Sequence, residues 1–218
     1  MQFLLDSADF EEARTCAQWG WVSGITTNPS ILAKNGKTVE KTLSKLKDIM
    51  PGPIFYQLSS ESEDLMVEEA RIAYGILKKQ LVLKIPATTA IFQACEHLSN
   101  KYTCAITSIF SASQAMVANA AGAKFALYYH NRAKRLLKNG KDLPVDMVNA
   151  LKHSGTAVIA ASLKSVQEIL EARQAGVKMM TTTMAVLEQI ARHELTEQAV
   201  KAFQGDGIGL HINSGGGR

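Results

Sequence analysis

Short apolar runs alternate along the chain with longer amphipathic stretches. The runs are mostly continuous rather than alternating in polarity, as is typical of strands that are covered on both faces of a parallel sheet. The pattern predicts eight strands, near residues 3–6, 22–26, 54–58, 81–85, 103–107, 125–129, 157–161 and 178–182.

Helix start and stop signals fall between the predicted strands. Gly20, Gly122 and Gly176 each follow a helical pattern and come shortly before the next strand, as expected of αβ turns. Four capping boxes mark helix starts: Asp9 with Glu12, Ser60 with Glu63, Ser111 with Gln114, and Ser165 with Glu168. The repeating unit is therefore a strand followed by a helix.

Eight such units in 218 residues predict an α/β fold, a single (β/α)8 TIM barrel, because no linker or shift in composition marks a second domain. A doubly wound sheet is the alternative, but residues 6–9 lack the glycine-rich loop that often follows the first strand there. Residues 196–204 are expected to form an additional C-terminal helix. The predicted catalytic domain is 1–205, and 206–218 is expected to be a flexible tail.

Composition narrows the classes of partner. The chain is 46% hydrophobic and 6% aromatic, its net charge is only +4, and no basic block alternates with aromatic residues. Nucleic acid is therefore not expected as a partner. The first residues lack the basic region and long apolar run of a signal peptide, and no segment is long enough to span a bilayer. We expect a cytoplasmic protein without membrane contact.

Cysteine and histidine spacing gives no metal-ligand pattern. Cys16, Cys95 and Cys104 stand in apolar contexts without Cys-x-x-Cys spacing, which predicts reduced core thiols rather than disulfides or zinc ligands. The five histidines are scattered along the chain. No metal is therefore expected.

Lys84 stands in an apolar run, residues 81–86, where an ammonium group is unexpected. Burial would lower the pKa of the lysine and raise the fraction of neutral amine, which can form a Schiff base with a carbonyl. The alternative is a lysine whose stem covers the core while its head lies in water, which is the commoner case for a lone lysine. The neighbouring strand ends must decide between these interpretations.

In a (β/α)8 barrel the carboxyl ends of the strands converge on one face. Each polar residue there has an ordinary explanation as a helix cap, a turn or a satisfied core aromatic. Together they supply a nucleophile, proton-transfer groups and a phosphate anchor. The strand ends in order carry Asp6, Thr26 with Asn28, Gln57, Lys84, Thr107, Tyr129 with Arg132, and Ser162.

Three segments resemble signature stretches of the transaldolase family: Gly24-Ile25-Thr26-Thr27-Asn28-Pro29-Ser30, Val82-Leu83-Lys84-Ile85-Pro86 and Ile159-Ala160-Ala161-Ser162. The likeness covers residues 1–205 and is greatest to the short branch that contains fructose-6-phosphate aldolases and small transaldolases. It implies a class I aldolase barrel that needs neither metal nor cofactor. It also implies a homo-oligomer, a pentamer or a decamer.

The resemblance also implies roles for the strand-end residues. Lys84 would form the iminium with the ketose, Asp6 and Asn28 would hold the donor's hydroxyls, and Thr26 belongs to the same substrate-binding set. Arg132 and Ser162 would bind phosphate, Ser162 at a helix start where backbone N–H groups attract anions. The basic residues that follow, Lys134, Arg135, Lys138 and Lys141, are expected to form a solvated helix face.

Three further positions bear on the reaction type. Gln57, Thr107 and Tyr129 match residues that position a water or supply a phenol in aldolases of this branch, whereas transaldolases usually have Glu and Phe in place of Gln57 and Tyr129. This chain follows the aldolase pattern. It departs from the family at Tyr128, where proline is usual, and at the end of the fifth strand, residues 105–108.

The resemblance thus predicts cleavage of fructose 6-phosphate to dihydroxyacetone and glyceraldehyde 3-phosphate, and the reverse addition, with sugar phosphates and dihydroxyacetone as partners. The alternative activity is transaldolase, which transfers the dihydroxyacetone unit to erythrose 4-phosphate. A non-enzymatic alternative is a barrel that binds sugar phosphate, in which Lys84 only pairs with an anion. A pyridoxal-phosphate site is a further possibility for a barrel lysine.

Overall fold

The computed structural model describes residues 1–60 and 62–207. Eight parallel strands form a closed barrel in which each strand pairs with the next in sequence and the last returns to the first, so the predicted (β/α)8 fold is confirmed. The strands are β1 (Gln2–Asp6), β2 (Val22–Thr26), β3 (Ile54–Gln57), β4 (Leu81–Pro86), β5 (Thr103–Ile109), β6 (Phe125–Tyr129), β7 (Ala157–Leu163) and β8 (Met179–Thr182).

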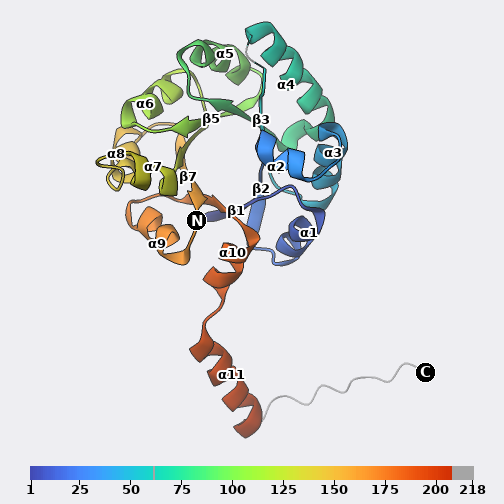
Figure 1. The fold of residues 1–218 in the computed structure, drawn as a ribbon, viewed down its shortest axis with the longest axis vertical. Helices are drawn as coiled ribbons and strands as arrows, with labels where there is room; N and C mark the ends of the chain where they lie inside the picture. Colours follow the sequence, from blue (N-terminus) through green and yellow to red (C-terminus); the bar gives the residue numbers. More distant parts are fainter. Residues whose placement is uncertain (61, 208–218) are drawn as a thin grey trace, which may run out of the picture.

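Helices surround the barrel as an outer ring (Figure 1). The helices of the ring are α1 (Phe10–Gln18), α2 (Pro29–Lys34), α3 (Val39–Ile49), α4 (Glu63–Leu77), α5 (Thr89–Ser99), α6 (Ala112–Ala120), α7 (His130–Leu136), α8 (Leu143–Ala150), α9 (Val166–Gln174) and α10 (Met184–Ala191). A further helix, α11 (Glu194–Asp206), follows α10. The ring buries the outer face of every strand, which explains why the strand sequences are continuously apolar.

The predicted strands lie at the observed positions, but β5 and β7 continue two residues beyond their predicted ends. Each of these two strands has a register shift near its carboxyl end, between Ile106 and Ile109 in β5 and between Ala160 and Leu163 in β7. Ser108 and Ser162 lie within these shifts with φ of 60° and 59°, in the left-handed region that serine rarely adopts. Both irregularities lie at the end of the barrel where the predicted site residues converge.

The helix signals are confirmed at three of the four predicted caps. Asp9, Ser111 and Ser165 accept hydrogen bonds from backbone N–H groups of the first turns of α1, α6 and α9. The prediction for Ser60 is wrong, because α4 begins after Ser62 and the Ser60 hydroxyl donates instead to Glu69, at 2.6 Å.

Two apolar clusters hold the fold together. A large one fills the space between strands and helices and contains all three cysteines, which are buried and free, as predicted. A smaller one fills the barrel interior. Its buried members are Leu4, Phe55, Val82, Ala105, Leu127, Ile159 and Ala161. The interior is therefore a packed core, which leaves chemistry to the rim.

Helix α11 confirms the additional C-terminal helix. It extends away from the barrel (Figure 1), and Leu195, Val200 and Phe203 on it are exposed. It continues to Asp206, one residue into the segment predicted to be a tail, and residues 208–218 of that segment lie outside the described residues. Among the helices that the structure describes, none is both long and apolar enough to cross a bilayer.

Candidate active site

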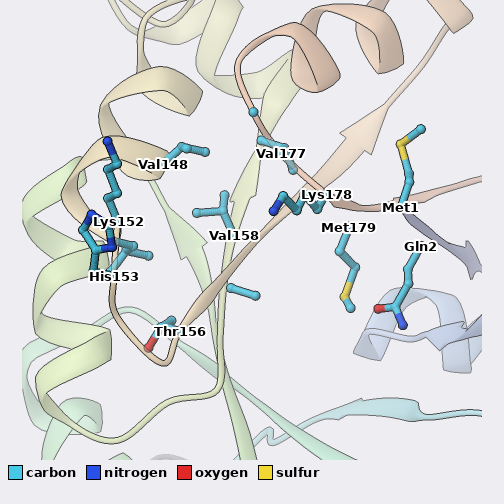
Figure 2. Close-up of a pocket in the computed structure, with 13 residues that line it drawn as sticks. Met1, Gln2, Val148, Lys152, His153, Thr156, Val158, Val177, Lys178 and Met179 are labelled. Atoms are coloured by element: carbon cyan, nitrogen blue, oxygen red, sulfur yellow. The ribbon is translucent and has the colours of Figure 1, made fainter.

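Cavities lie at both ends of the barrel. One of them, of about 620 Å³, lies at the amino ends of β1, β7 and β8, where Gln2, Val158 and Met179 line it (Figure 2). None of the predicted site residues lines this cavity. The active sites of (β/α)8 enzymes lie at the opposite face, at the carboxyl ends of the strands. A smaller cavity of about 170 Å³ occupies that face. Its lining residues are Asp6, Thr26, Asn28, Lys84, Leu127, Tyr129, Arg132, Ala161, Ser162, Lys164 and Thr181.

Lys84 lies in the wall of this cavity. Its side chain is only 3% exposed, so the alternative of a lysine head in water does not hold. The Nζ atom donates a hydrogen bond of 2.7 Å to the carbonyl oxygen of Thr27. Burial lowers the pKa of Lys84, and the electrostatic influence of the neighbouring Tyr129 and Asp6 opposes that shift. A lowered pKa increases the fraction of neutral amine, the form that attacks a carbonyl.

A chain of hydroxyl groups holds the Asp6 carboxylate. Thr26 Oγ1 donates to Asp6 Oδ1 at 2.7 Å and lies 2.5 Å from Thr181 Oγ1. Thr26 and Thr181 are buried, so these hydrogen-bonded hydroxyl groups are shielded from solvent. The sequence did not single out Thr181, because it belongs to a run of three threonines and only barrel closure, which places β8 beside β1, brings it to Thr26.

Asn28 both caps a helix and lines the cavity. Its Oδ1 caps α2 by accepting from the backbone N–H of Ile31 at 2.9 Å, with Pro29 as the first helical residue. The cap uses the carbonyl oxygen, and Asn28 also lines the cavity. The Asn-Pro pair is therefore a helix start rather than only a turn.

Gln57 and Thr107 lie beside the cavity rather than in its lining. Gln57 pairs with Lys84 in the β3–β4 ladder, and its Oε1 is buried without a hydrogen-bond partner among the described residues. An unpaired buried acceptor is costly, so this atom is suited to receive a donor from a water or a substrate.

Tyr129, at the end of β6, carries the phenol of the site. Its oxygen accepts hydrogen bonds from Thr107 Oγ1 at 3.4 Å and from Ser108 Oγ at 3.2 Å. The Arg132 guanidinium lies 4.8 Å from the centre of the Tyr129 ring, which places the cation over the aromatic face. The sequence did not identify Ser108, because the residue after a strand-end threonine normally points to the other face.

Arg132, Ser162 and Lys164 form a basic and polar edge of the cavity. The prediction that Ser162 lies at a helix start is wrong, because Ser162 belongs to β7 and the cap of α9 is Ser165. The N–H group of Ser162 therefore does not belong to a helix start. Lys164 was not predicted as a site residue; its backbone N–H donates to Glu168 Oε2 at 2.7 Å, which holds this segment in place.

On the outer side of the end of β6, four side chains form a hydrogen-bonded network separate from the cavity. Tyr128 is fully buried and its hydroxyl lies 3.0 Å from His130 Nδ1, while His130 Nε2 lies 3.1 Å from Glu171 Oε2. Lys134 also donates to Glu171, at 2.6 Å, and these contacts lower the pKa of Glu171 to about 2. Tyr128 thus packs behind the cavity and adds no group to it.

Fold and site together define a (β/α)8 barrel with a buried lysine amine beside a carboxylate, a phenol and a basic edge. The chain belongs to the transaldolase family: the sequence pattern described as Transaldolase/Fructose-6-phosphate aldolase matches residues 3–212. The protein is therefore an enzyme of the aldolase or transaldolase type.

Relatives of similar length agree with this assignment. A probable transaldolase of Symbiobacterium thermophilum is 36% identical over 209 residues, covering 94% of this chain and 96% of the relative. A probable transaldolase of Brevibacillus brevis is 34% identical, covering 94% of this chain and 97% of the relative.

Solved structures with a similar barrel include mandelate oxidase, with a TM-score of 0.59 and 15% identity. The match covers 84% of this chain and 64% of the oxidase, so this chain spans less than two thirds of that protein. At this identity the likeness concerns the barrel fold alone.

Proposed function

We propose that the protein is a Schiff-base aldolase that cleaves fructose 6-phosphate to dihydroxyacetone and glyceraldehyde 3-phosphate and catalyses the reverse addition. The observation that carries this proposal is the Tyr129 hydroxyl at the cavity, hydrogen-bonded by Thr107 and Ser108, because a phenol can transfer the proton that release of a three-carbon ketone requires.

In the proposed reaction the neutral Lys84 amine attacks C2 of the ketose. The hydroxyl of the resulting carbinolamine takes up a proton from solvent and leaves as water, which gives an iminium. The low exposure of Lys84 and its lowered pKa support this step. Asp6 is the carboxylate among the described lining residues, and Thr26 orients it to accept the C4 hydroxyl proton. The C3–C4 electron pair then moves to the iminium, which leaves an enamine on Lys84 and releases the aldehyde, and Asp6 returns the C4 hydroxyl proton to solvent.

Release requires protonation of the enamine at C3. The Tyr129 O–H bond breaks, a C3–H bond forms, and the resulting iminium is hydrolysed to dihydroxyacetone and the Lys84 amine, while the proton liberated by hydrolysis returns to the phenolate. Gln57, with its unpaired buried Oε1, is suited to hold the water. Arg132, Ser162 and Lys164 would bind the phosphate of the sugar.

Transaldolase activity is the second candidate, and the names of the relatives favour it. In that reaction the enamine waits for an acceptor aldehyde such as erythrose 4-phosphate. The two activities share every step up to the enamine and differ only in whether a proton or an aldehyde receives the C3 electrons.

We also propose that the chain works as a homo-oligomer in the cytoplasm. The exposed apolar residues Leu195, Val200 and Phe203 on the projecting α11 favour contact with another copy. The three buried free cysteines suit a reducing compartment.

Two measurements test the reaction. Borohydride reduction in the presence of dihydroxyacetone, followed by peptide mass analysis, should place a stable adduct on Lys84. Incubation with fructose 6-phosphate alone should then yield free dihydroxyacetone. An unmodified Lys84 would contradict both enzymatic proposals, whereas an adduct with turnover only after addition of erythrose 4-phosphate would favour transaldolase.

A further inference from the structure

Ser108 has an unusual backbone for its residue type. It lies in the register shift of β5 between Ile106 and Ile109, and its φ of 60° is in the left-handed region. A non-glycine residue in this region is strained, and such residues cluster at functional sites where the surrounding structure over-determines them.

The irregular backbone has a direct consequence for two side chains. Consecutive residues of a regular strand point to opposite faces of the sheet. At the end of β5, however, the hydroxyls of both Thr107 and Ser108 reach the oxygen of Tyr129, at 3.4 Å and 3.2 Å. The β5 irregularity thus brings a second hydroxyl to the phenol.

The direction of these bonds determines what the phenol can do. Both hydroxyls donate, so the Tyr129 oxygen is the acceptor in each. Its own hydrogen therefore remains for a partner in the cavity, which Tyr129 lines together with Lys84. The same two donors would stabilise the negative oxygen that remains after the proton has left.

We propose that Ser108 is a positioning residue that directs the Tyr129 hydroxyl toward the enamine on Lys84 and stabilises the phenolate formed when that proton moves to C3. This inference rests on the proposed function. The step breaks the phenol O–H bond and forms the C3–H bond, and the phenolate recovers its proton when water hydrolyses the iminium. Ser108 itself exchanges no atom with the substrate.

Two variants, Ser108→Gly and Ser108→Ala, separate the effect of losing the hydroxyl from the effect of backbone strain. Both remove the hydroxyl, but glycine adopts φ near 60° without strain, so Ser108→Gly should fold at least as stably as the wild type. The exposed Ser113, in the first turn of α6, supplies the control Ser113→Ala, which keeps the contacts of Tyr129. If the hydroxyl matters, both Ser108 variants lose function equally although their stabilities differ.

The measurement is the exchange of dihydroxyacetone hydrogens for deuterium in D₂O, followed by proton NMR, because it reports enamine protonation without an aldehyde. Both Ser108 variants should exchange about tenfold more slowly than the wild type. In the Tyr129→Phe background the Ser108 substitution should have no further effect, since both act on one group.

Wild-type exchange in Ser108→Gly, or an equal loss in the Tyr129→Phe background, would overturn the role of Ser108. Borohydride trapping keeps this outcome separate from the proposed function. An adduct on wild-type Lys84 together with unchanged exchange in Ser108→Gly overturns only the Ser108 inference. Absence of any adduct on wild-type Lys84 overturns both.

Discussion

Lys84 donates a hydrogen bond of 2.7 Å to the backbone carbonyl of Thr27, a residue 57 positions earlier in the chain. The bond joins two of the three segments that resemble the family, the Thr-Thr-Asn-Pro-Ser stretch between the end of β2 and the start of α2 and the lysine strand β4. It also aims the amine across the top of β3 rather than out to solvent, since the Lys84 side chain is 3% exposed.

Replacement of the nucleophile should abolish turnover. Lys84→Met keeps the length and apolar packing of the side chain but cannot form a Schiff base, so cleavage of fructose 6-phosphate should fall by about 10⁴-fold or more. A coupled assay for glyceraldehyde 3-phosphate measures the loss. The exposed Lys79→Met, just before β4, serves as control and should retain wild-type turnover. Substantial residual activity in Lys84→Met would contradict a covalent mechanism.

Burial of Lys84 should also make stability depend on pH. Its pKa is lowered in the folded chain, so between that value and the ordinary value near 10.4 the unfolded chain binds more protons and the free energy of unfolding rises with pH. Lys84→Met has no such titrating group. The free energy of unfolding of the variant minus that of the wild type should therefore be greatest at low pH and decline as pH rises toward about 10. Urea unfolding at several pH values measures this difference; a constant difference would contradict the shift.

Removal of the Thr181 hydroxyl should impair orientation of Asp6. Thr181→Val keeps the side-chain shape but deletes the partner of Thr26, so turnover should fall by about 3- to 10-fold with a stability loss of about 1 kcal/mol. Thr156→Val is the matched control, because Thr156 is also buried and hydrogen-bonded, at 2.6 Å to Ala123, but lies at the opposite end of the barrel. Equal losses of activity in the two variants would indicate a general effect on folding.

Tyr129→Phe should shift the activity from aldol cleavage toward transfer. Loss of the phenol removes the proposed proton donor, so release of dihydroxyacetone without an acceptor should fall by about 100-fold, within the range for a general acid. Transfer to erythrose 4-phosphate needs no proton at C3 and should fall much less. The ratio of the two rates, measured on one preparation, provides the test. An unchanged ratio would exclude the role given to the phenol.

Arg132→Ala should distinguish phosphorylated from unphosphorylated substrates. If the guanidinium binds phosphate, KM for glyceraldehyde 3-phosphate in the addition reaction should rise by about 10- to 100-fold, while KM for glyceraldehyde changes little. Arg135→Ala, on the same helix and exposed, is the control. Because Arg132 also covers the Tyr129 ring, kcat should be followed together with KM. Equal rises for both aldehydes would argue against a phosphate site.

Local pattern accounts for much of the architecture. The positions of all eight strands follow from short apolar runs, because a strand enclosed by helices must be apolar on both faces whatever its neighbours are. Caps such as Asp9 and Ser111 were also predictable, since an N-cap bond spans only two or three residues. The prediction that Ser60 caps a helix failed because its hydroxyl donates to the carboxylate of Glu69, nine residues further along the chain.

The sequence by itself determined the barrel, its family and the strand ends that carry Lys84, Asp6 and Tyr129, because these depend on local periodicity and on residue identity. Tertiary structure alone decided which side chains meet there. Thr181 reaches Thr26 only through barrel closure, and Ser108 reaches Tyr129 only because the irregular end of β5 turns two successive hydroxyls to one face. Such contacts depend on strand register and backbone irregularity, which arise from pairing between distant segments and leave no periodic signal in the chain.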